Sequence, residues 1–507
     1  MNNNIFAQNA RIAATMTTTE NGHAAASTTG SAVLDLYGQV GALRGQDKIR
    51  ILNLLEKAFK DDLLLATRTV FYARDCRGGT GERELFRLAI CWMAQNYTDI
   101  LRKNLHCIPF YGRWDDLYAL VGTKLENEAF AIMGEQLFND IRGMAKGEPI
   151  SLLAKWLKSC NASSEESRKL GRITRKKLRF PNEKSYRQTL AQLRRHIDIV
   201  EAKMSSGKWG KIEYDKIPSR AGMIYREAFK KHDNIRYGEY LEAVKKGAKK
   251  INTAMNTPQD LVHAYGAYTA WDLRRKQDDP TIELMWKNLP DYVDSDENVL
   301  CMVDVSGSMD GRPIEVSTGL GIYFAQKNRG AFHNLFMTFE SVPKFVSLTE
   351  GASLLENLCE ILDSDWGGST DLNLACKELL RFAIKNNVPQ ADMPTRLLII
   401  SDMEIDNACG IYRWDRSHTD FSKILFIDEL REMYRRAGYK MPQVIFWNVE
   451  SRDNHFHTKS DVPGTMLASG SSPAVFKAVM AMEDLEVTPY DAMVEVLNGE
   501  RYSRVTV

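Results

Sequence analysis

The stretch Val299-Leu-Cys-Met-Val-Asp-Val-Ser-Gly-Ser-Met-Asp-Gly311 decides the fold of the C-terminal part of the chain. It begins with an apolar run, Val299–Val303, which is typical of a buried strand. The run then breaks into Asp304, Ser306 and Ser308, which place one carboxylate and two hydroxyls within five residues. Oxygen donors of this kind are the ligands that hard divalent cations such as Mg²⁺ prefer. The stretch therefore predicts a strand that ends at a candidate metal-binding loop.

The residues from about 297 onward alternate between short apolar runs and amphipathic segments. The expected strands are Val299–Val303, Leu335–Phe339, Lys344–Ser347, Arg396–Ser401, Gln443–Trp447 and Gly464–Ala468. The expected helices are Pro313–Asn328, Ser353–Leu362, Asn373–Lys385, Ser422–Arg436, Pro473–Ala481 and Pro489–Asn498. Such alternation predicts a mostly parallel sheet with helices on both faces. In such a sheet, ligands bind outside the carboxyl ends of the strands, where the loop after Val303 falls.

Two other loops supply oxygen donors at the same predicted edge. The segment Gly367-Gly-Ser-Thr-Asp371 precedes an expected helix, so that Thr370 offers a hydroxyl and Asp371 can cap the helix. Asp402 directly follows the expected strand Arg396–Ser401. The predicted metal ligands are therefore Asp304, Ser306, Ser308, Thr370 and Asp402.

These five positions, in this order, resemble the metal-ion-dependent adhesion site of von Willebrand factor A domains, and the resemblance covers residues 297–507. It implies a Rossmann-like, doubly wound parallel sheet that binds Mg²⁺ or Mn²⁺. Ser306, Ser308 and either Thr370 or a water would bind the ion directly, and Asp304 and Asp402 largely through water. Few charged direct ligands would leave an open coordination position for an acidic side chain or a phosphate of a partner.

The N-terminal half has a different pattern. Residues 1–30 are rich in Asn, Ala, Thr, Ser and Gly, which predicts a disordered tail. From residue 31 to 296, apolar residues recur at helical spacing, for example Ile49, Leu52 and Leu55. Several such segments joined by short loops predict an all-α domain of stacked helix pairs.

The net charge of +1 hides a basic block. Residues 155–250 contain 26 Lys and Arg against 11 Asp and Glu, a balance of +15, which leaves −14 for the rest of the chain. Such a block favours a polyanion as partner, and interleaved aromatic residues could stack unpaired bases. The alternative is a set of solvated helix faces over core aromatics. The candidate nucleic-acid-binding residues are Arg168, Lys169, Arg172, Arg175, Lys176, Lys177, Arg179, Arg187, Arg194, Arg195, Lys230 and Lys231.

The helical half also resembles the Ro autoantigen (TROVE) family, on the segments Arg77-Gly-Gly-Thr-Gly-Glu-Arg83 and Phe110-Tyr-Gly-Arg-Trp114. That resemblance implies HEAT-like repeats that close into a ring with a von Willebrand domain and bind single-stranded RNA ends and small structured RNAs. Residues 155–300 are similar to an uncharacterised bacterial, viral and fungal family of the same layout. The segments that carry this similarity are Trp209-Gly-Lys-Ile-Glu-Tyr214, Ile217-Pro-Ser219, Lys231-His-Asp233 and Lys250-Ile-Asn252.

The leading hypothesis is a non-catalytic RNA-binding scaffold. The alternative is a metal-dependent protein–protein adaptor in a chaperone-like or assembly complex, with an acidic protein ligand at the metal. A metal-dependent nuclease is disfavoured because two-metal sites need more carboxylates and no general base is evident. The eight cysteines are scattered without a Cys-x-x-Cys motif, which predicts a reducing, cytoplasmic compartment. The chain lacks a run of eighteen apolar residues, so we expect no transmembrane helix.

Overall fold

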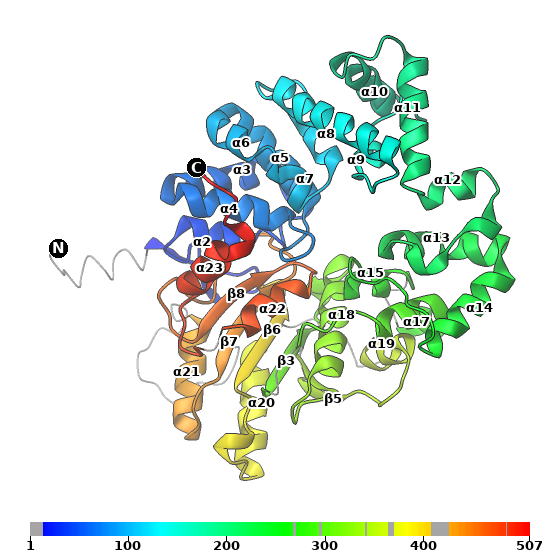
Figure 1. The fold of residues 1–507 in the computed structure, drawn as a ribbon. Helices are drawn as coiled ribbons and strands as arrows, with labels where there is room; N and C mark the ends of the chain where they lie inside the picture. The colour runs from blue at the N-terminus through cyan, green and yellow to red at the C-terminus, as the bar shows by residue number, and fades with distance from the viewer. Residues whose placement is uncertain are drawn as a thin grey trace. The chain divides into compact units, whose positions relative to one another are not determined.

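The computed structural model describes residues 14–266, 270–293, 297–339, 342–362, 370–406, 425–482 and 484–507 (Figure 1). The chain divides into two compact units. The α/β unit consists of Met1–Thr69, Gly78–Thr80 and Asn256–Gly499, and the helical unit consists of Val70–Arg77, Gly81–Met255 and Glu500–Val507. The predicted combination of a helical domain with an α/β domain is therefore confirmed, but the predicted boundaries need correction. No helix among the described residues has the length and apolar character needed to span a bilayer.

A six-stranded sheet forms the centre of the α/β unit. Its strands are β3 (Val299–Asp304), β4 (Leu335–Phe339), β5 (Lys344–Ser347), β6 (Arg396–Ser401), β7 (Gln443–Asn448) and β8 (Thr465–Ser469). They lie in the order β5-β4-β3-β6-β7-β8, and only β5 runs antiparallel to its neighbour. All six strands match the predicted segments to within one residue.

Helices cover both faces of this sheet. They include α18 (Arg312–Lys327), α19 (Leu354–Leu362), α20 (Leu372–Lys385), α21 (Phe426–Ala437), α22 (Ala474–Met480) and α23 (Pro489–Asn498). On β7, the ring of Phe446 packs against Phe426 of α21, and the ring of Trp447 packs against Phe324 of α18. Because successive side chains of a strand point to opposite faces, α18 and α21 cover opposite sides. This explains why β3, β6, β7 and β8 are buried along their whole length.

The strand order reverses between β3 and β6. From β3 the chain moves outward to β4, whereas from β6 it moves the other way through β7 to β8. The connections after the two central strands therefore leave in opposite directions. This is the topological switch point of a doubly wound sheet, where a crevice opens at the carboxyl ends of the strands.

The N-terminal segment is part of the α/β unit. Residues 14–30 contain the antiparallel strands β1 (Met16–Thr18) and β2 (Ala24–Ala26), so the predicted disordered tail is wrong for these residues; residues 1–13 lie outside the described part. Ala24–Ala26 are buried, and Ala26 exchanges two backbone hydrogen bonds of 2.8 and 2.9 Å with Phe456. Small side chains permit this close backbone approach but give little apolar signal in the sequence.

Helices α2 (Ala32–Tyr37) and α3 (Lys48–Asp61) also pack in the α/β unit, which corrects the predicted helical-domain start at residue 31. A Cβ atom on Gly41 would lie 2.7 Å from the backbone nitrogen of Gly470, so only glycine fits at this contact. Arg50 of α3 donates five hydrogen bonds, two of them to Ser451 and one to the carbonyl of Asp453. Helix α4 (Leu63–Arg74) contains the boundary between the units.

Three further helices assigned by sequence to the helical domain belong to the α/β unit: α15 (Pro258–His263), α16 (Ala270–Leu273) and α17 (Pro280–Lys287). Helix α15 lies against α18, where Gln259 and His263 bind the two carboxylate oxygens of the buried Glu315 at 2.9 and 2.7 Å. This polar contact holds α15 against α18, which covers the sheet. Helical periodicity predicts a helix but not the unit that the helix packs in, so the sequence placed α15 in the wrong unit.

The helical unit is built from helices that pack mostly on their neighbours in sequence. They are α5 (Arg83–Asn96), α6 (Thr98–Asn104), α7 (Cys107–Tyr111), α8 (Glu126–Lys146), α9 (Leu153–Trp156), α10 (Glu165–Lys177), α11 (Glu183–His196), α12 (Val200–Ser205), α13 (Ser219–His232) and α14 (Asn234–Lys245). Short 3₁₀ turns at Trp114–Leu120, Trp209–Lys211 and Tyr214–Lys216 join them. Neighbour packing of this kind is expected of stacked helices. A HEAT-like repeat stays a prediction.

The last eight residues complete the helical unit rather than the α/β unit. The Arg501 guanidinium and the Tyr502 hydroxyl both donate to the buried carboxylate of Asp75. The Tyr502 ring stacks on Tyr111 with ring centroids 5.5 Å apart. The predicted α/β domain of residues 297–507 therefore ends at residue 499, because the final segment supplies the partner of an otherwise unpaired buried acid.

Candidate functional site

The loop after β3 is folded around the carboxylate of Asp304. Asp304 is fully buried, and its Oδ1 accepts a 2.9 Å hydrogen bond from the backbone N–H of Ser306. The hydroxyl oxygens of Ser306 and Ser308 lie 3.1 Å apart. The structure thus brings these three predicted metal ligands together at the carboxyl end of β3.

The end of β6 meets this loop across the switch point. Ser401 Oγ donates a 2.6 Å hydrogen bond to Asp304 Oδ2, and the next residue is Asp402. The Oδ1 of Asp402 accepts from the backbone N–H of Glu404 at 3.1 Å. Its Oδ2 is buried and, among the described residues, accepts no hydrogen bond. The guanidinium of Arg452 pairs with it at longer range, with Nη1 3.7 Å from that oxygen.

Burial perturbs both carboxylates. Burial, together with the nearby charge of Asp402, raises the pKa of Asp304 to about 7. Burial also raises the pKa of Asp402, although the Arg452 charge and the Ser308 hydroxyl oppose that rise. Two buried carboxylates that face one another need a cation or protons to offset their charge.

Thr370 is tied to the segment that follows β6. Its backbone N–H donates to Asp406 Oδ2 at 2.5 Å, and the backbone N–H of Asp406 donates back to the Thr370 carbonyl at 3.0 Å. Asp371 caps α20 by accepting from the N–H of Leu374 at 2.8 Å, as the sequence predicts. Residues 367–369 of the predicted loop lie outside the described residues. Thr370 is buried and is held against Asp406, four residues beyond Asp402 in the segment after β6.

The donor set is rich in hydroxyls and poor in charged ligands. Throughout the described ranges, no three His, Cys, Asp or Glu side chains are grouped in a way that could hold a metal. A cation here would therefore depend on the oxygens of Ser306, Ser308 and Thr370, with the two aspartates nearby, and hard divalent ions accept such ligands. Ser401, which orients Asp304, was not among the predicted site residues; its position as the last residue of an apolar strand before Asp402 was the available signal.

Glu404 serves the packing of the N-terminal segment. Its Oε2 accepts from the backbone N–H of Glu20 at 2.8 Å, and its Oε1 lies 2.7 Å from Nδ1 of His455. The hydroxyl of Thr19 donates to the carbonyl of Ile405 at 2.6 Å. The β1–β2 hairpin is therefore anchored directly beyond Asp402.

The twelve predicted nucleic-acid-binding residues divide into three groups. Three arginines cap backbone carbonyls; Arg194, for example, donates to Ala154 and Leu157 at 2.8 Å each. The carbonyl-capping residues are Arg168, Arg175 and Arg194, and the ion-paired residues are Arg172, Lys177 and Lys230. In the part of the chain that the structure describes, the other six are exposed and form no ion pair: Lys169, Lys176, Arg179, Arg187, Arg195 and Lys231.

Most aromatic residues of the basic block lie in the core. Five of the nine aromatic residues between positions 155 and 250 are buried: Tyr186, Tyr214, Phe229, Tyr237 and Tyr240. Trp209 is already stacked on His232, with ring centroids 4.5 Å apart. The structure therefore favours, for these rings, the alternative of core aromatics beneath solvated helix faces.

Arg113, in the second segment of the TROVE resemblance, and charged residues close to both segments form ion pairs within the helical unit. Arg74 and Arg87 both bind the buried carboxylate of Asp116 at 2.8 Å. Arg113 pairs with Asp115 at 3.0 Å and lies 4.0 Å from the ring centroid of Trp156. These charges are matched inside the helical unit and stabilise its fold.

Comparison with known proteins gives two family matches. The family described as Domain of unknown function (DUF2828) matches residues 19–141 and 150–297, just over half of the chain. The family described as Domain of unknown function (DUF7788) matches residues 298–503. The first match ends and the second begins directly before β3, which agrees with the change of sequence pattern near residue 297.

One relative and one solved structure cover nearly the whole chain. Uncharacterized protein L728 of Acanthamoeba polyphaga mimivirus is 27% identical over 522 residues, which cover 96% of this chain and 87% of that protein. The crystal structure of the Ro (RSR) protein of Deinococcus radiodurans is 14% identical, with a TM-score of 0.42. That alignment covers 93% of this chain and 100% of the Deinococcus chain.

Proposed function

The chain belongs to the family described as Domain of unknown function (DUF2828), and for this member we propose a non-catalytic, Ro-like RNA-binding scaffold. In this proposal the helical unit, with HEAT-like helices, binds single-stranded or structured small RNA. The α/β unit, as a von Willebrand factor A domain, holds a divalent cation. The protein acts in the reducing environment of the cytoplasm.

The observation that carries the RNA proposal is the set of exposed cations without ion pairs on the helical unit. Lys169, Lys176 and Arg179 lie on or just after α10, and Arg187 and Arg195 lie on α11. An exposed cation without a protein counter-charge can neutralise a phosphate without first breaking an ion pair. Because each neutralised phosphate releases a counterion, such a surface binds RNA with an affinity that falls steeply with salt.

The test is a filter-binding titration of single-stranded RNA against the full-length protein between 50 and 200 mM salt. The charge-reversal variant Lys169→Glu/Lys176→Glu/Arg179→Glu should bind more weakly at every salt concentration. If all three residues contact phosphates, the slope of log K against log salt should shrink by about 2. Absence of binding by the unaltered protein at low salt would contradict RNA binding.

The matched control reverses three exposed lysines of the α/β unit, in Lys48→Glu/Lys287→Glu/Lys385→Glu. It changes the net charge by the same amount, so it separates a local contact from the overall charge. If both triple variants lose RNA affinity to the same extent, the α10 surface is not the binding surface.

For the metal, we propose Mg²⁺ or Mn²⁺ at the switch point between β3 and β6. Ser306, Ser308 and Thr370 would supply oxygen ligands, and Asp304 and Asp402 would orient bound waters. The buried Oδ2 of Asp402, which accepts no hydrogen bond among the described residues, and the repulsion between two buried carboxylates support this assignment. When bound, the ion would offer an open coordination position to an anionic oxygen of a partner.

The second candidate function is a metal-dependent protein–protein adaptor, and the same pair of buried aspartates favours it. An acidic side chain of a partner protein would then fill the open coordination position. Partner capture by the full-length protein should be lost both on addition of a chelator and in Asp304→Ala. Capture that survives both changes would show that the partner does not bind through the metal.

A further inference from the structure

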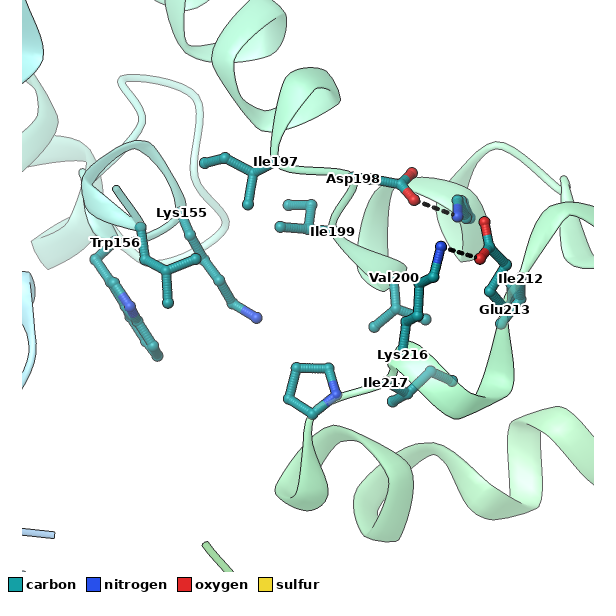
Figure 2. A pocket seen from close by; sticks show the side chains of 13 residues that line it. Lys155, Trp156, Ile197, Asp198, Ile199, Val200, Ile212, Glu213, Lys216 and Ile217 are labelled. Atoms are coloured by element: carbon teal, nitrogen blue, oxygen red, sulfur yellow. Dashed lines mark hydrogen bonds and ion pairs between the residues drawn. The ribbon is translucent and has the colours of Figure 1, made fainter. Parts of the chain in front are cut away.

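Two adjoining hollows lie at the junction of α11 and α12, inside the helical unit. The larger, which we name the cationic groove, has a volume of about 960 Å³ and is lined by residues between Ser159 and Lys211. The smaller, which we name the apolar pocket, has a volume of about 280 Å³ (Figure 2). The two share Asp198, Ile199 and Lys203, so a single wall separates them.

The cationic groove carries an excess of positive charge that the protein does not neutralise. Seven of its lining residues are basic, against Asp198 and Glu201 as the acids. Lys203 pairs with Asp198 at 2.7 Å, and Arg194 is engaged with backbone carbonyls. Over the described ranges, the remaining five form no ion pair and are exposed: Lys184, Arg187, Arg195, Lys208 and Lys211.

The apolar pocket differs in that its charges are balanced. Its three lysines are each paired with an acid: Lys203 with Asp198, Lys216 with Glu213, and Lys155 with Glu201 at 3.2 Å. Figure 2 shows the ion pairs of Asp198 and of Lys216 with Glu213 beside the hollow, together with the apolar side chains around it. The apolar lining consists of Leu152, Trp156, Ile197, Ile199, Val200, Ile212, Ile217 and Pro218.

Trp156 forms one side of the apolar pocket, and Val200 and Ile217 lie on the other (Figure 2). The Trp156 ring is held in place by the Arg113 guanidinium, 4.0 Å from its centroid. A volume of about 280 Å³ lies just below the range of about 300–1,000 Å³ that is typical of drug-sized ligands. The pocket therefore suits one flat ring system with apolar faces and polar edges.

We infer that the apolar pocket receives one unpaired base of a single-stranded RNA whose flanking phosphates lie in the cationic groove. A base is uncharged, with apolar faces and hydrogen-bonding edges, and so matches a neutral apolar pocket with a polar rim. A phosphate matches the unneutralised lysines and arginines of the adjoining cationic groove. The shared wall places the two subsites side by side, as a base and its own backbone require. This inference rests on the proposed RNA binding.

The test uses the full-length protein and the variant Leu152→Asp. Leu152 is 51% exposed at the mouth of the pocket and is the N-cap residue of α9, a position that favours aspartate. The change therefore places a charge at the pocket without disturbing the helix. The matched control is Ile235→Asp, because Ile235 is 72% exposed in the first turn of α14 and lines neither hollow.

We expect Leu152→Asp to bind single-stranded RNA about tenfold more weakly than the unaltered protein, and Ile235→Asp to bind within twofold of it. With an RNA of equal length made of abasic residues, Leu152→Asp and the unaltered protein should bind equally. RNA binding that is intact and equal in Leu152→Asp and Ile235→Asp would overturn the base pocket while leaving RNA binding in place. Absence of RNA binding by the unaltered protein at low salt would instead remove the proposed function itself. If Leu152→Asp loses binding of an acidic, phenylalanine-containing peptide while its RNA binding is unchanged, the pocket is a peptide site and the inference is overturned.

Discussion

Replacing Asp304 by asparagine should remove the dependence of the stability of the α/β unit on Mg²⁺. The Asp304 carboxylate has its pKa raised from 3.8 to about 7, so the folded state binds more protons than the unfolded state between these values. Stability therefore falls as pH rises through this window, and the full penalty is present above pH 7. About three pKa units correspond to at most about 4 kcal/mol at pH 8.

Asparagine removes that penalty and keeps most of the local contacts. Its side-chain oxygen can still accept from the N–H of Ser306, and the Ser401 hydroxyl can turn to accept from the new amide. Rearranging one buried hydrogen bond costs about 1 kcal/mol. In chelator, Asp304→Asn should therefore equal or exceed the unaltered protein, by up to about 3 kcal/mol. At a Mg²⁺ concentration one hundred times its Kd, the free energy of unfolding of the unaltered protein should rise by about 2.7 kcal/mol, and that of the variant should not change.

Hydrogen exchange of peptides from β3 and β6 at pH 8 measures this locally, and a change of about 1.4 kcal/mol appears as a tenfold change in exchange rate. The control Asp310→Asn removes an exposed carboxylate from the same loop and should change protection by less than about 0.5 kcal/mol in either condition. If the unaltered protein is better protected than Asp304→Asn by the same margin in chelator and in Mg²⁺, the charge of Asp304 is not the source of strain and the reasoning fails.

Three further predictions concern the packing of each unit. Arg50→Ala removes five hydrogen bonds, and it should lower the free energy of unfolding of the α/β unit, measured in urea, by about 3 kcal/mol. The control Lys48→Ala, on the exposed side of α3, should change that free energy by less than about 0.5 kcal/mol. Burial lowers the pKa of His457 to about 3, so the unfolded state binds the extra proton below pH 6.5. The free energy of unfolding should therefore fall by about 1.4 kcal/mol per pH unit below pH 6.5. Urea denaturation at pH 5 and pH 7 measures this fall, and the His457→Gln variant should not show it. Arg501→Ala leaves the buried carboxylate of Asp75 with one fewer partner and should destabilise the helical unit by about 2 kcal/mol, read from hydrogen exchange of α4 and α5; unchanged protection would contradict the pairing.

The parallel sheet could be predicted because its signals are local. A strand buried on both faces appears as an apolar run, and Val299–Val303 and Arg396–Ser401 need no partner to be recognised. The polar residues that follow each run fall at one edge whatever the strand order is. The site could therefore be anticipated at Asp304 and Asp402 before the neighbouring positions of β3 and β6 were known.

The role of each basic residue could not be predicted in the same way. Arg194 and Arg195 are adjacent on α11, yet Arg194 caps carbonyls of α9 and its C-terminal turn, and Arg195 is exposed in the cationic groove. Adjacent helix positions point about 100° apart, so the outcome depends on which side α9 occupies. Trp156 was overlooked for the same reason, since only the packing of α9 and α12 creates the apolar pocket around it.

The unit boundaries were mispredicted because each unit is built from segments that lie far apart in the sequence. Residues 14–69 pack in the α/β unit, where Ala26 pairs through its backbone with Phe456. We therefore expect residues 256–499 expressed alone to aggregate, and co-expression with residues 1–69 to give a soluble complex. Gly41→Val is the matched control for the co-expressed segment, because a Cβ atom there would lie 2.7 Å from the backbone nitrogen of Gly470. Soluble, cooperatively unfolding 256–499 without residues 1–69 would show that the sheet is complete without its N-terminal cover.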